Sequence, residues 1–211
     1  MSFFIFGGKL LILYTHNRSP YGRKVIIAAH VLHLIQEIEV RDVNSRDPND
    51  PIRLINPLGK MPALVDEKEI IYDSRVILEY LNYKSRDASI FPDSEKKKIS
   101  VLTNLARING IMDAAVLIVY EHRLREKDKI VNDIIEYQRD KIIRSLKQIA
   151  REPHEHFETR IPNAAEIGLA CCLDYLDLRK QLNWREFASN LESWLESFSL
   201  NVPGYEETLP V

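Results

Sequence analysis

The stretch 56–74, NPLGKMPALVDEKEIIYDS, constrains the fold more strongly than any other part of the chain. It holds two short apolar runs, 63–65 and 70–72, which are rich in β-branched and aromatic residues and are separated by four polar residues. This pattern predicts two antiparallel strands joined by a hairpin turn. Pro62 stands directly before the first run, where a strand tolerates proline and where the Met61–Pro62 bond can take the cis form.

A helix is expected to begin where the hairpin ends. Asp73 and Ser74 are N-cap residue types, and apolar residues follow them at helical spacing. The predicted buried stripe consists of Val76, Ile77, Tyr80 and Leu81. Unpaired backbone N–H groups, the positive end of the helix dipole and the Ser74 hydroxyl together favour a bound carboxylate. Because Asp73 offers the opposite charge, the pair can hold an α-amino-acid head group; the alternative is that both residues only cap the helix.

The composition is that of an ordinary globular protein. The chain has 211 residues, of which 45% are hydrophobic and 28% charged, and its formal net charge is -2. This balance argues against nucleic acid as the main partner. No apolar run reaches the roughly 18 residues that a spanning helix needs, and the stretch 1–13 lacks the marks of a signal peptide. We therefore expect a cytoplasmic protein, in which the adjacent Cys171 and Cys172 are reduced thiols of a helical core.

The first part of the chain has the pattern of a small α/β domain. The stretch 9–14 predicts a central strand, because its residues 10–13 form an unbroken apolar run of the kind that is buried on both faces. Ser19 followed by Pro20 is a strong signal for the start of a helix. This helix is expected to bury Val25, Ile26, Ala28, Ala29 and Leu32. The stretch 37–40 alternates charged and β-branched residues, as a half-buried strand does, so that the three elements form a right-handed parallel crossover.

The remaining chain divides at a predicted linker, 85–93, which interrupts the helical pattern. Before it, the proline-rich stretch 42–57 predicts a long loop with a short helix, and the hairpin and its helix complete a first domain over 1–84. After it, apolar residues at helical spacing predict an all-helical bundle over 94–211. The predicted helices of this second domain span 94–125, 128–150, 163–178 and 184–198.

This arrangement resembles the cytosolic glutathione S-transferases, in which a thioredoxin-like domain precedes a helical domain. The resemblance covers nearly the whole chain and rests on the stretches 19–25 (SPYGRKV), 56–64 (NPLGKMPAL) and 73–81 (DSRVILEYL). The family also places a capping box in the second domain, and 163–167 (NAAEI) is similar to it, with Asn and Glu where Thr or Ser and Asp are usual. Similarity to the bacterial members in particular is found at 175–177, 184–185 and 205–210.

The resemblance implies that glutathione is a co-substrate and that no metal takes part. Ser19, at the start of the first helix, would donate a hydrogen bond to the glutathione sulfur, because a hydroxyl donor beside a helix dipole stabilises a thiolate. Tyr14, Thr15 and Asn17 are close enough in the chain that one of them could instead be nearest the sulfur. The first domain has no cysteine, which argues against mixed-disulfide chemistry at this position.

The resemblance also assigns the peptide part of glutathione. Met61, before a cis Pro62, would pair its backbone with that of the cysteinyl residue, as a strand edge captures an extended peptide. Asp73 and Ser74 would hold the γ-glutamyl head group. Lys60 would reach the glycyl carboxylate.

The second substrate, a small hydrophobic electrophile, is expected between the domains, against the first loop and the inner face of the long helix. The residues suggested for its pocket are Tyr14, Asn17, Arg107, Ile111 and Tyr120. The family further implies a homodimer that pairs the first domain of one subunit with the helical domain of the other.

Three charged or polar clusters are interpreted without a functional role. The stretch 154–158, which contains two histidines and two glutamates, is predicted to be a solvated loop rather than a metal site, because it has no distant partner ligand. The runs 23–24 and 96–98 are predicted to be short charged faces of helices.

The predicted function is that of a glutathione transferase in detoxification, which stabilises the glutathione thiolate and conjugates it to the electrophile. Fold alone does not exclude a non-catalytic binding protein of the stringent-starvation type, which associates with bacterial RNA polymerase. The intact glutathione motif favours the enzyme. The identity of the electrophile is not encoded in a motif, because loops and helix faces build its pocket.

Overall fold

The computed structural model describes residues 10–152, 154–158 and 160–210, so the predicted strand start at Lys9 and most of the stretch 1–13 lie outside the described residues. The chain divides into two compact units, one ending at Ser89 and the other running from Ile90 to Pro210. The first unit contains β1 (Leu11–Thr15), α1 (Pro20–Val31), β2 (Ile38–Asp42), α2 (Ile52–Ile55), β3 (Ala63–Asp66), β4 (Glu69–Ile71) and α3 (Ser74–Lys84). The second contains α4 (Glu95–Leu124), α5 (Asn132–Ile149), α6 (Ala164–Arg179), α7 (Arg185–Ala188) and α8 (Leu191–Asn201). The predicted fold class, a thioredoxin-like unit of β-α-β and β-β-α followed by a helical bundle, is confirmed.

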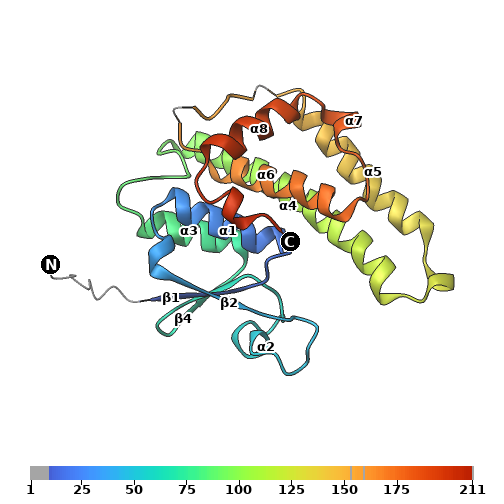
Figure 1. Cartoon of the computed structure of the whole chain (residues 1–211), viewed down its shortest axis with the longest axis horizontal. Coiled ribbons are helices and arrows are strands. Elements are labelled where there is room, and N and C mark those ends of the chain that lie inside the picture. The colour runs from blue at the N-terminus through green and yellow to red at the C-terminus, as the bar shows by residue number, and fades with distance from the viewer. Residues whose placement is uncertain (1–9, 153, 159, 211) are drawn as a thin grey trace. The chain divides into compact units, whose positions relative to one another are not determined.

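The four strands of the first unit form one mixed sheet in the order β2-β1-β3-β4 (Figure 1). β1 runs parallel to β2, as predicted, and antiparallel to β3, which pairs with β4 in the predicted hairpin. The register places Tyr14 opposite Ala63 and Leu64 opposite Ile71. Because neighbouring antiparallel strands run in opposite directions, the end of β1, the entrance to β3 and the exit from β4 all lie at the same edge of the sheet.

The two faces of β1 are not covered equally. Leu11 and Leu13 are fully buried, whereas Ile12 and Tyr14 are half-buried. α1 and α3 pack against each other on one face of the sheet, and the short α2 lies on the other (Figure 1). The prediction that both faces are fully buried is therefore wrong, because an unbroken apolar run does not reveal how much helix covers each face.

α3 buries a face shifted from the predicted stripe. Its buried residues are Ser74, Ile77, Leu78 and Leu81. Val76 is 51% exposed and Tyr80 is only half-buried. Tyr80 donates its hydroxyl hydrogen to the Asp66 carboxylate, which also binds Lys84 Nζ at 2.8 Å. A polar partner for the tyrosine tip explains why Tyr80 does not lie in the core.

In the second unit, the long helix expected at 94–125 is confirmed as α4, which packs against both α5 and α6. One 18-residue window of α4 has a mean hydropathy of 1.4, so this helix is long and apolar enough to cross a membrane, contrary to the expectation from apolar run length. Within that window, 44% of the residues are buried inside the protein. We interpret α4 as the core helix of the bundle, because a central helix passes the same test of length and composition.

The last predicted helix of the bundle is interrupted. The stretch 184–198 forms two helices, α7 and α8, with Ser189 and Asn190 in the turn between them. Asn190 Nδ2 donates a hydrogen bond to Ala150 O at 3.0 Å. Short polar side chains that bond to the backbone favour helix boundaries, and this competes with continuous helical periodicity.

Two cations on α1 contradict the prediction of a solvated charged face. Arg23 is 4% exposed and Lys24 is 0% exposed. Lys24 Nζ lies 5.8 Å from the centroid of the Tyr21 ring. Charged groups this deeply buried need specific interactions in place of water, and short-range sequence patterns do not reveal such interactions. In contrast, Lys96 and Lys97 at the start of α4 are exposed, as predicted.

The two cysteines of the second unit and the loop 154–158 differ in how well they match the predictions. Cys171 and Cys172 are free and buried in α6, as predicted. In the predicted solvated loop, His156 is exposed, but His154 is half-buried. The His154 ring interacts with Ile149 O at 2.8 Å and packs at 6.0 Å against the Trp194 ring. Part of this loop is therefore anchored to the helical core rather than solvated.

Candidate functional site

Ser19 begins α1, directly after the loop that leaves β1. Its Oγ accepts a hydrogen bond from Gly22 N at 3.2 Å, so the predicted N-cap is confirmed. A serine hydroxyl that accepts a hydrogen bond in this way still has its own hydrogen to donate. Among the described residues, none accepts that hydrogen. The hydroxyl can therefore donate to a ligand atom at the positive end of the α1 dipole.

Thr15 lies at the end of β1, but its hydroxyl is covered. The residue is 2% exposed, and Thr15 Oγ1 has no hydrogen-bond partner in the described part of the chain. A Cβ atom added to Gly22 would lie 1.7 Å from Thr15 Oγ1, so the first turn of α1 rests directly on this oxygen. A ligand cannot reach Thr15 Oγ1 unless α1 moves. Thr15 is therefore a poor candidate for the group nearest the sulfur.

The other two candidates near the sulfur, Tyr14 and Asn17, have different surroundings. Tyr14 OH accepts a hydrogen bond from Arg41 Nη1 at 3.1 Å, and the Arg41 guanidinium carbon lies 5.7 Å from the centre of the Tyr14 ring. Arg41 in turn pairs with Glu39 at 2.6 Å. Asn17 is exposed, and its amide has no hydrogen-bond partner among the described residues. Both residues keep a free donor, so their roles stay predictions beside that of Ser19.

The segment before β3 holds the predicted contacts for the cysteinyl and glycyl residues. The Met61–Pro62 bond is cis. Met61 is half-buried, and its backbone N–H and C=O take part in none of the hydrogen bonds found among the described residues. Lys60 is exposed, and its ammonium has no ion-pair partner in that same part of the chain. An unpaired backbone and an unpaired cation next to each other are what an extended peptide with a terminal carboxylate requires.

Asp73 is the N-cap of α3, as predicted. Its Oδ1 accepts a hydrogen bond from Arg75 N at 2.9 Å, and its Oδ2 lies 2.7 Å from Arg75 Nη2. The hydrogen bonds from the Arg75 side chain, followed by those from its backbone, lower the pKa of Asp73, and the positive charge of Lys24 acts in the same direction. Sequence reasoning missed Arg75, although an arginine two residues after an N-cap aspartate is a visible signal.

The first turn of α3 also offers backbone donors. Ser74 is buried, with 3% exposure, and its hydroxyl has no hydrogen-bond partner within the described chain. Because Asp73 caps only Arg75 N, the backbone N–H groups of Ser74 and Val76 remain available. These donors lie at the positive end of a helix, which is a favourable place for a carboxylate.

The three segments of the candidate site meet at one small apolar cluster. Val43, Ile52 and Ala63 form this cluster, and Tyr14, Met61 and Tyr72 pack against it. Tyr72 directly precedes Asp73, and Met61 directly follows Lys60. Together with the sheet register, this cluster brings the predicted cysteinyl and γ-glutamyl contacts to the same edge of the sheet.

The residues predicted to contact an electrophile from α4 have unequal exposure. Ile111 is 1% exposed and belongs to the core, whereas Tyr120 is 47% exposed. Arg107 Nη1 pairs with Glu152 at 2.7 Å, and its Nη2 donates to Asn104 Oδ1 at 2.8 Å. Only Tyr120 of these three presents a free side-chain surface, and the role of all three stays a prediction.

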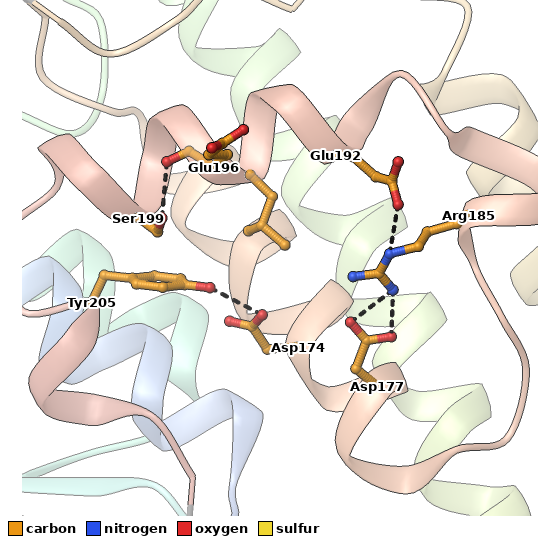
Figure 2. Close-up of a pocket in the computed structure, with 8 residues that line it drawn as sticks. Asp174, Asp177, Arg185, Glu192, Glu196, Ser199 and Tyr205 are labelled. Atoms are coloured by element: carbon orange, nitrogen blue, oxygen red, sulfur yellow. Dashed lines mark hydrogen bonds and ion pairs between the residues drawn. The ribbon is translucent and has the colours of Figure 1, made fainter.

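A separate pocket of about 360 Å³ lies within the second unit, between α6 and the chain from α7 to Tyr205 (Figure 2). Arg185 bridges Asp177 at 2.8 Å and Glu192 at 2.8 Å. Tyr205 OH donates to Asp174 Oδ1 at 3.1 Å. These bonds join α6 to the two following helices and to the tail.

The chain is similar to known proteins over almost its full length. A family model described as the N-terminal domain of glutathione S-transferases matches residues 13–88. The uncharacterized GST-like protein YibF of Escherichia coli is 31% identical over 176 residues, which is 82% of this chain and 83% of that protein. The chain belongs to the glutathione S-transferase family. The matched residues 13–88 include every predicted glutathione contact of this family member.

Two solved structures of bacterial family members are similar to this chain in fold. A glutathione transferase family member from Pseudomonas fluorescens Pf-5, solved with bound glutathione, has a TM-score of 0.87 and 34% identity, covering 95% of this chain and 99% of that one. A glutathione S-transferase from Methylobacillus flagellatus KT, also with glutathione bound, has a TM-score of 0.87 and 33% identity, covering 95% and 100%. This chain therefore shares its fold with both of these family members over nearly its full length.

Proposed function

We propose that this transferase binds reduced glutathione at the shared sheet edge of its first unit and stabilises the thiolate through Ser19. The observation that carries this proposal is the Ser19 hydroxyl, which accepts from Gly22 N and keeps its own hydrogen to donate. A serine hydroxyl is far too weak a base to deprotonate a thiol, but as a donor beside a helix N-terminus it favours the negative sulfur. Each unit by which the thiol pKa falls corresponds to about 1.4 kcal/mol.

The peptide part of glutathione has a matching group for each of its charges. Lys60, which has no ion-pair partner among the described residues, would bind the glycyl carboxylate. The unpaired backbone of Met61 would bind the cysteinyl backbone. Asp73 would accept from the γ-glutamyl ammonium, and Ser74, with the free N–H groups of α3, would bind the γ-glutamyl carboxylate. Glutathione bound to two similar bacterial structures supports the same ligand here.

The proposed reaction is attack of the thiolate on an electrophilic carbon of a small hydrophobic compound. A carbon–sulfur bond forms; in a displacement the leaving group departs with its electron pair, and in an addition a proton from solvent completes the product. We also propose that the enzyme works as a cytoplasmic homodimer in detoxification, as its family resemblance implies.

Two assays test the proposal. The purified protein should be retained on a glutathione-affinity column and released by free glutathione, and it should conjugate glutathione to an aryl halide faster than the buffer alone. Retention without conjugation would support glutathione binding but contradict the proposed transferase reaction for aryl halides. Failure in both assays would overturn the proposal and favour a binding protein of the stringent-starvation type.

A further inference from the structure

Asn56 is a buried polar residue in the turn that leads from α2 to the proposed glutathione contacts. It is 2% exposed. Its side-chain amide uses both ends: Oδ1 accepts from Leu58 N at 3.0 Å, and Nδ2 donates to Lys60 O at 2.8 Å. The amide oxygen faces a backbone N–H group, and the amide nitrogen faces a backbone C=O group. A rotated amide would lose both hydrogen bonds, so the two contacts fix its orientation.

The backbone of Asn56 is also fully bonded. Its N–H donates to Ile52 O at 2.8 Å, and its C=O accepts from Gly59 N at 2.7 Å. Gly59 has a φ of 61°, a conformation that glycine adopts without strain. Four hydrogen bonds from one residue therefore close the turn 56–60 and tie it to the end of α2.

The bond from Asn56 to Lys60 O determines where the next N–H group points. The Lys60–Met61 peptide bond is trans, since the cis bonds of the described chain are Met61–Pro62 and Tyr72–Asp73. In a trans peptide the C=O and the following N–H point in opposite directions. Lys60 C=O is directed at the buried Asn56 amide, so Met61 N–H is directed away from it. That N–H makes no hydrogen bond with the described residues.

We propose that Asn56 is a positioning residue that aims Met61 N–H at the carbonyl oxygen of the glutathione cysteinyl residue. This inference rests on the proposed function. Asn56 does not touch the ligand; it acts by holding the Lys60–Met61 peptide plane in one orientation. Without the Asn56 donor, Lys60 C=O loses this hydrogen bond, and the peptide plane is free to rotate.

The test compares two identical substitutions in the first unit. Asn56→Asp keeps the acceptor for Leu58 N but replaces the donor to Lys60 O by a carboxylate oxygen. Asn44→Asp is the matched control, because Asn44 Oδ1 accepts from Arg46 N at 3.2 Å in the same type of turn but aims no peptide of the proposed site. At pH 8, Asn56→Asp should raise the Kd and the KM for glutathione about tenfold, the loss of roughly one hydrogen bond to the ligand. Asn44→Asp should change neither by more than about twofold.

Three further measurements separate positioning from general loosening. Turnover at saturating glutathione and its pH profile should stay at the parent values in Asn56→Asp, because the sulfur is activated at α1. The affinity loss should persist for γ-glutamylcysteine and disappear for γ-glutamylcysteamine, which has no cysteinyl carbonyl. If Asn56→Asp does not fold, Asn56→Ala with the same two ligands replaces it.

The outcomes are distinct. Equal affinity of the Asn56 and Asn44 variants for glutathione overturns the positioning role alone, as does an equal affinity loss for both truncated ligands. A parent protein that binds no glutathione overturns the proposed function and this inference with it. A loss confined to the ligands that contain the cysteinyl carbonyl supports the role of Asn56.

Discussion

The Asp73 carboxylate and the Arg75 guanidinium form an ion pair, with 2.7 Å between Oδ2 and Nη2. Asp73 Oδ1 also caps Arg75 N at 2.9 Å. The carboxylate proposed to bind the γ-glutamyl ammonium therefore already accepts from three nitrogens of Arg75: the backbone N, Nε and Nη2. A ligand ammonium would share the carboxylate oxygens with the Arg75 side chain. Substitutions of Asp73 can separate ligand binding from helix capping.

The first prediction separates ligand binding from capping at Asp73. Asp73→Asn keeps an oxygen for Arg75 N but removes the charge, whereas Asp73→Ala removes both. Both variants should lose glutathione affinity by about tenfold or more, because the ligand ammonium is left without its carboxylate. Only Asp73→Ala should also lose about 1 kcal/mol of unfolding free energy, the usual value of an N-cap. Calorimetry and urea unfolding measure the two effects; parent-like affinity in Asp73→Ala would make the residue a cap only.

The second prediction concerns Ser19. Ser19→Ala should raise the pKa of bound glutathione and slow conjugation near neutral pH, while the KM for glutathione changes little. Removing the principal donor to a developing or bound anion typically costs about 10² to 10³ in rate, and less where neighbours substitute. The pH profile of turnover measures this effect.

Ser19→Thr is the matched control for that experiment, because it keeps the hydroxyl and should retain most of the activity. Unchanged turnover with a parent-like pH profile in Ser19→Ala would reduce Ser19 to a helix cap. The same profile would then be measured for Asn17→Ala and Tyr14→Phe, because both residues keep a free donor in the structure.

Local signals explain which parts of the site the sequence predicted. Ser19, Asp73 and Asn163 all cap helices where expected, because a cap depends on a side chain and the three residues that follow it. The cis bond before Pro62 and the hairpin after it are equally local. The sequence therefore predicts the three segments of the site, and the sheet register then brings them to one edge.

Contacts between distant residues explain what the sequence did not predict. Lys24 follows a second cation, Arg23, on α1, yet it is fully buried, because burial depends on what packs over the helix. Asn56 reads as part of an Asn-Pro turn, and its bond to Lys60 O becomes visible only once the turn is closed. Ser189 and Asn190 interrupt a continuous helical pattern through the bond of Asn190 to Ala150 O, 40 residues away.

The third prediction is a loss of stability at high pH through Tyr80 and Lys84. Burial, followed by its hydrogen bond to Asp66, raises the pKa of Tyr80, and the hydrogen bond to Asp66 raises the pKa of Lys84. When the folded pKa exceeds the unfolded one, the stabilisation is fully present below the unfolded pKa, here about 10, and is lost as pH rises through the folded pKa. Urea midpoints of the parent should therefore be level up to about pH 10 and fall above it.

Tyr80→Phe checks this assignment. It should reduce the unfolding free energy by about 1 kcal/mol at pH 8 and flatten the decrease above about pH 10. Tyr83→Phe is the control, because Tyr83 lies on the same helix and is 84% exposed. If the urea midpoint of Tyr80→Phe falls as steeply at high pH as that of the parent, groups other than Tyr80 cause the loss of stability.

The fourth prediction is a homodimer that involves the outer face of α3. Val76 and Tyr83 are seven residues apart, so they lie on one side of this helix, and they are 51% and 84% exposed. Light scattering at micromolar concentration should give twice the mass of the chain. Val76→Glu should shift the protein towards the monomer, whereas Leu200→Glu, at a residue 78% exposed on α8, should not. If light scattering gives the mass of a single chain for the parent protein, the prediction of a homodimer is wrong.

The last prediction concerns the capping box of α6, which carries much of the buried core of the second unit. Asn163 Oδ1 accepts from Ala165 N at 2.9 Å and from Glu166 N at 3.2 Å, and Glu166 Oε2 accepts from Asn163 N at 2.8 Å. Asn163→Ala should therefore lower the unfolding free energy by about 1 to 2 kcal/mol. Ser94→Ala is the matched control, because Ser94 stands at the N-cap of α4 without a capping hydrogen bond and should change stability by less than about 0.5 kcal/mol. Equal urea midpoints for the two variants would mean that the packing of α6, and not its cap, determines where the helix begins.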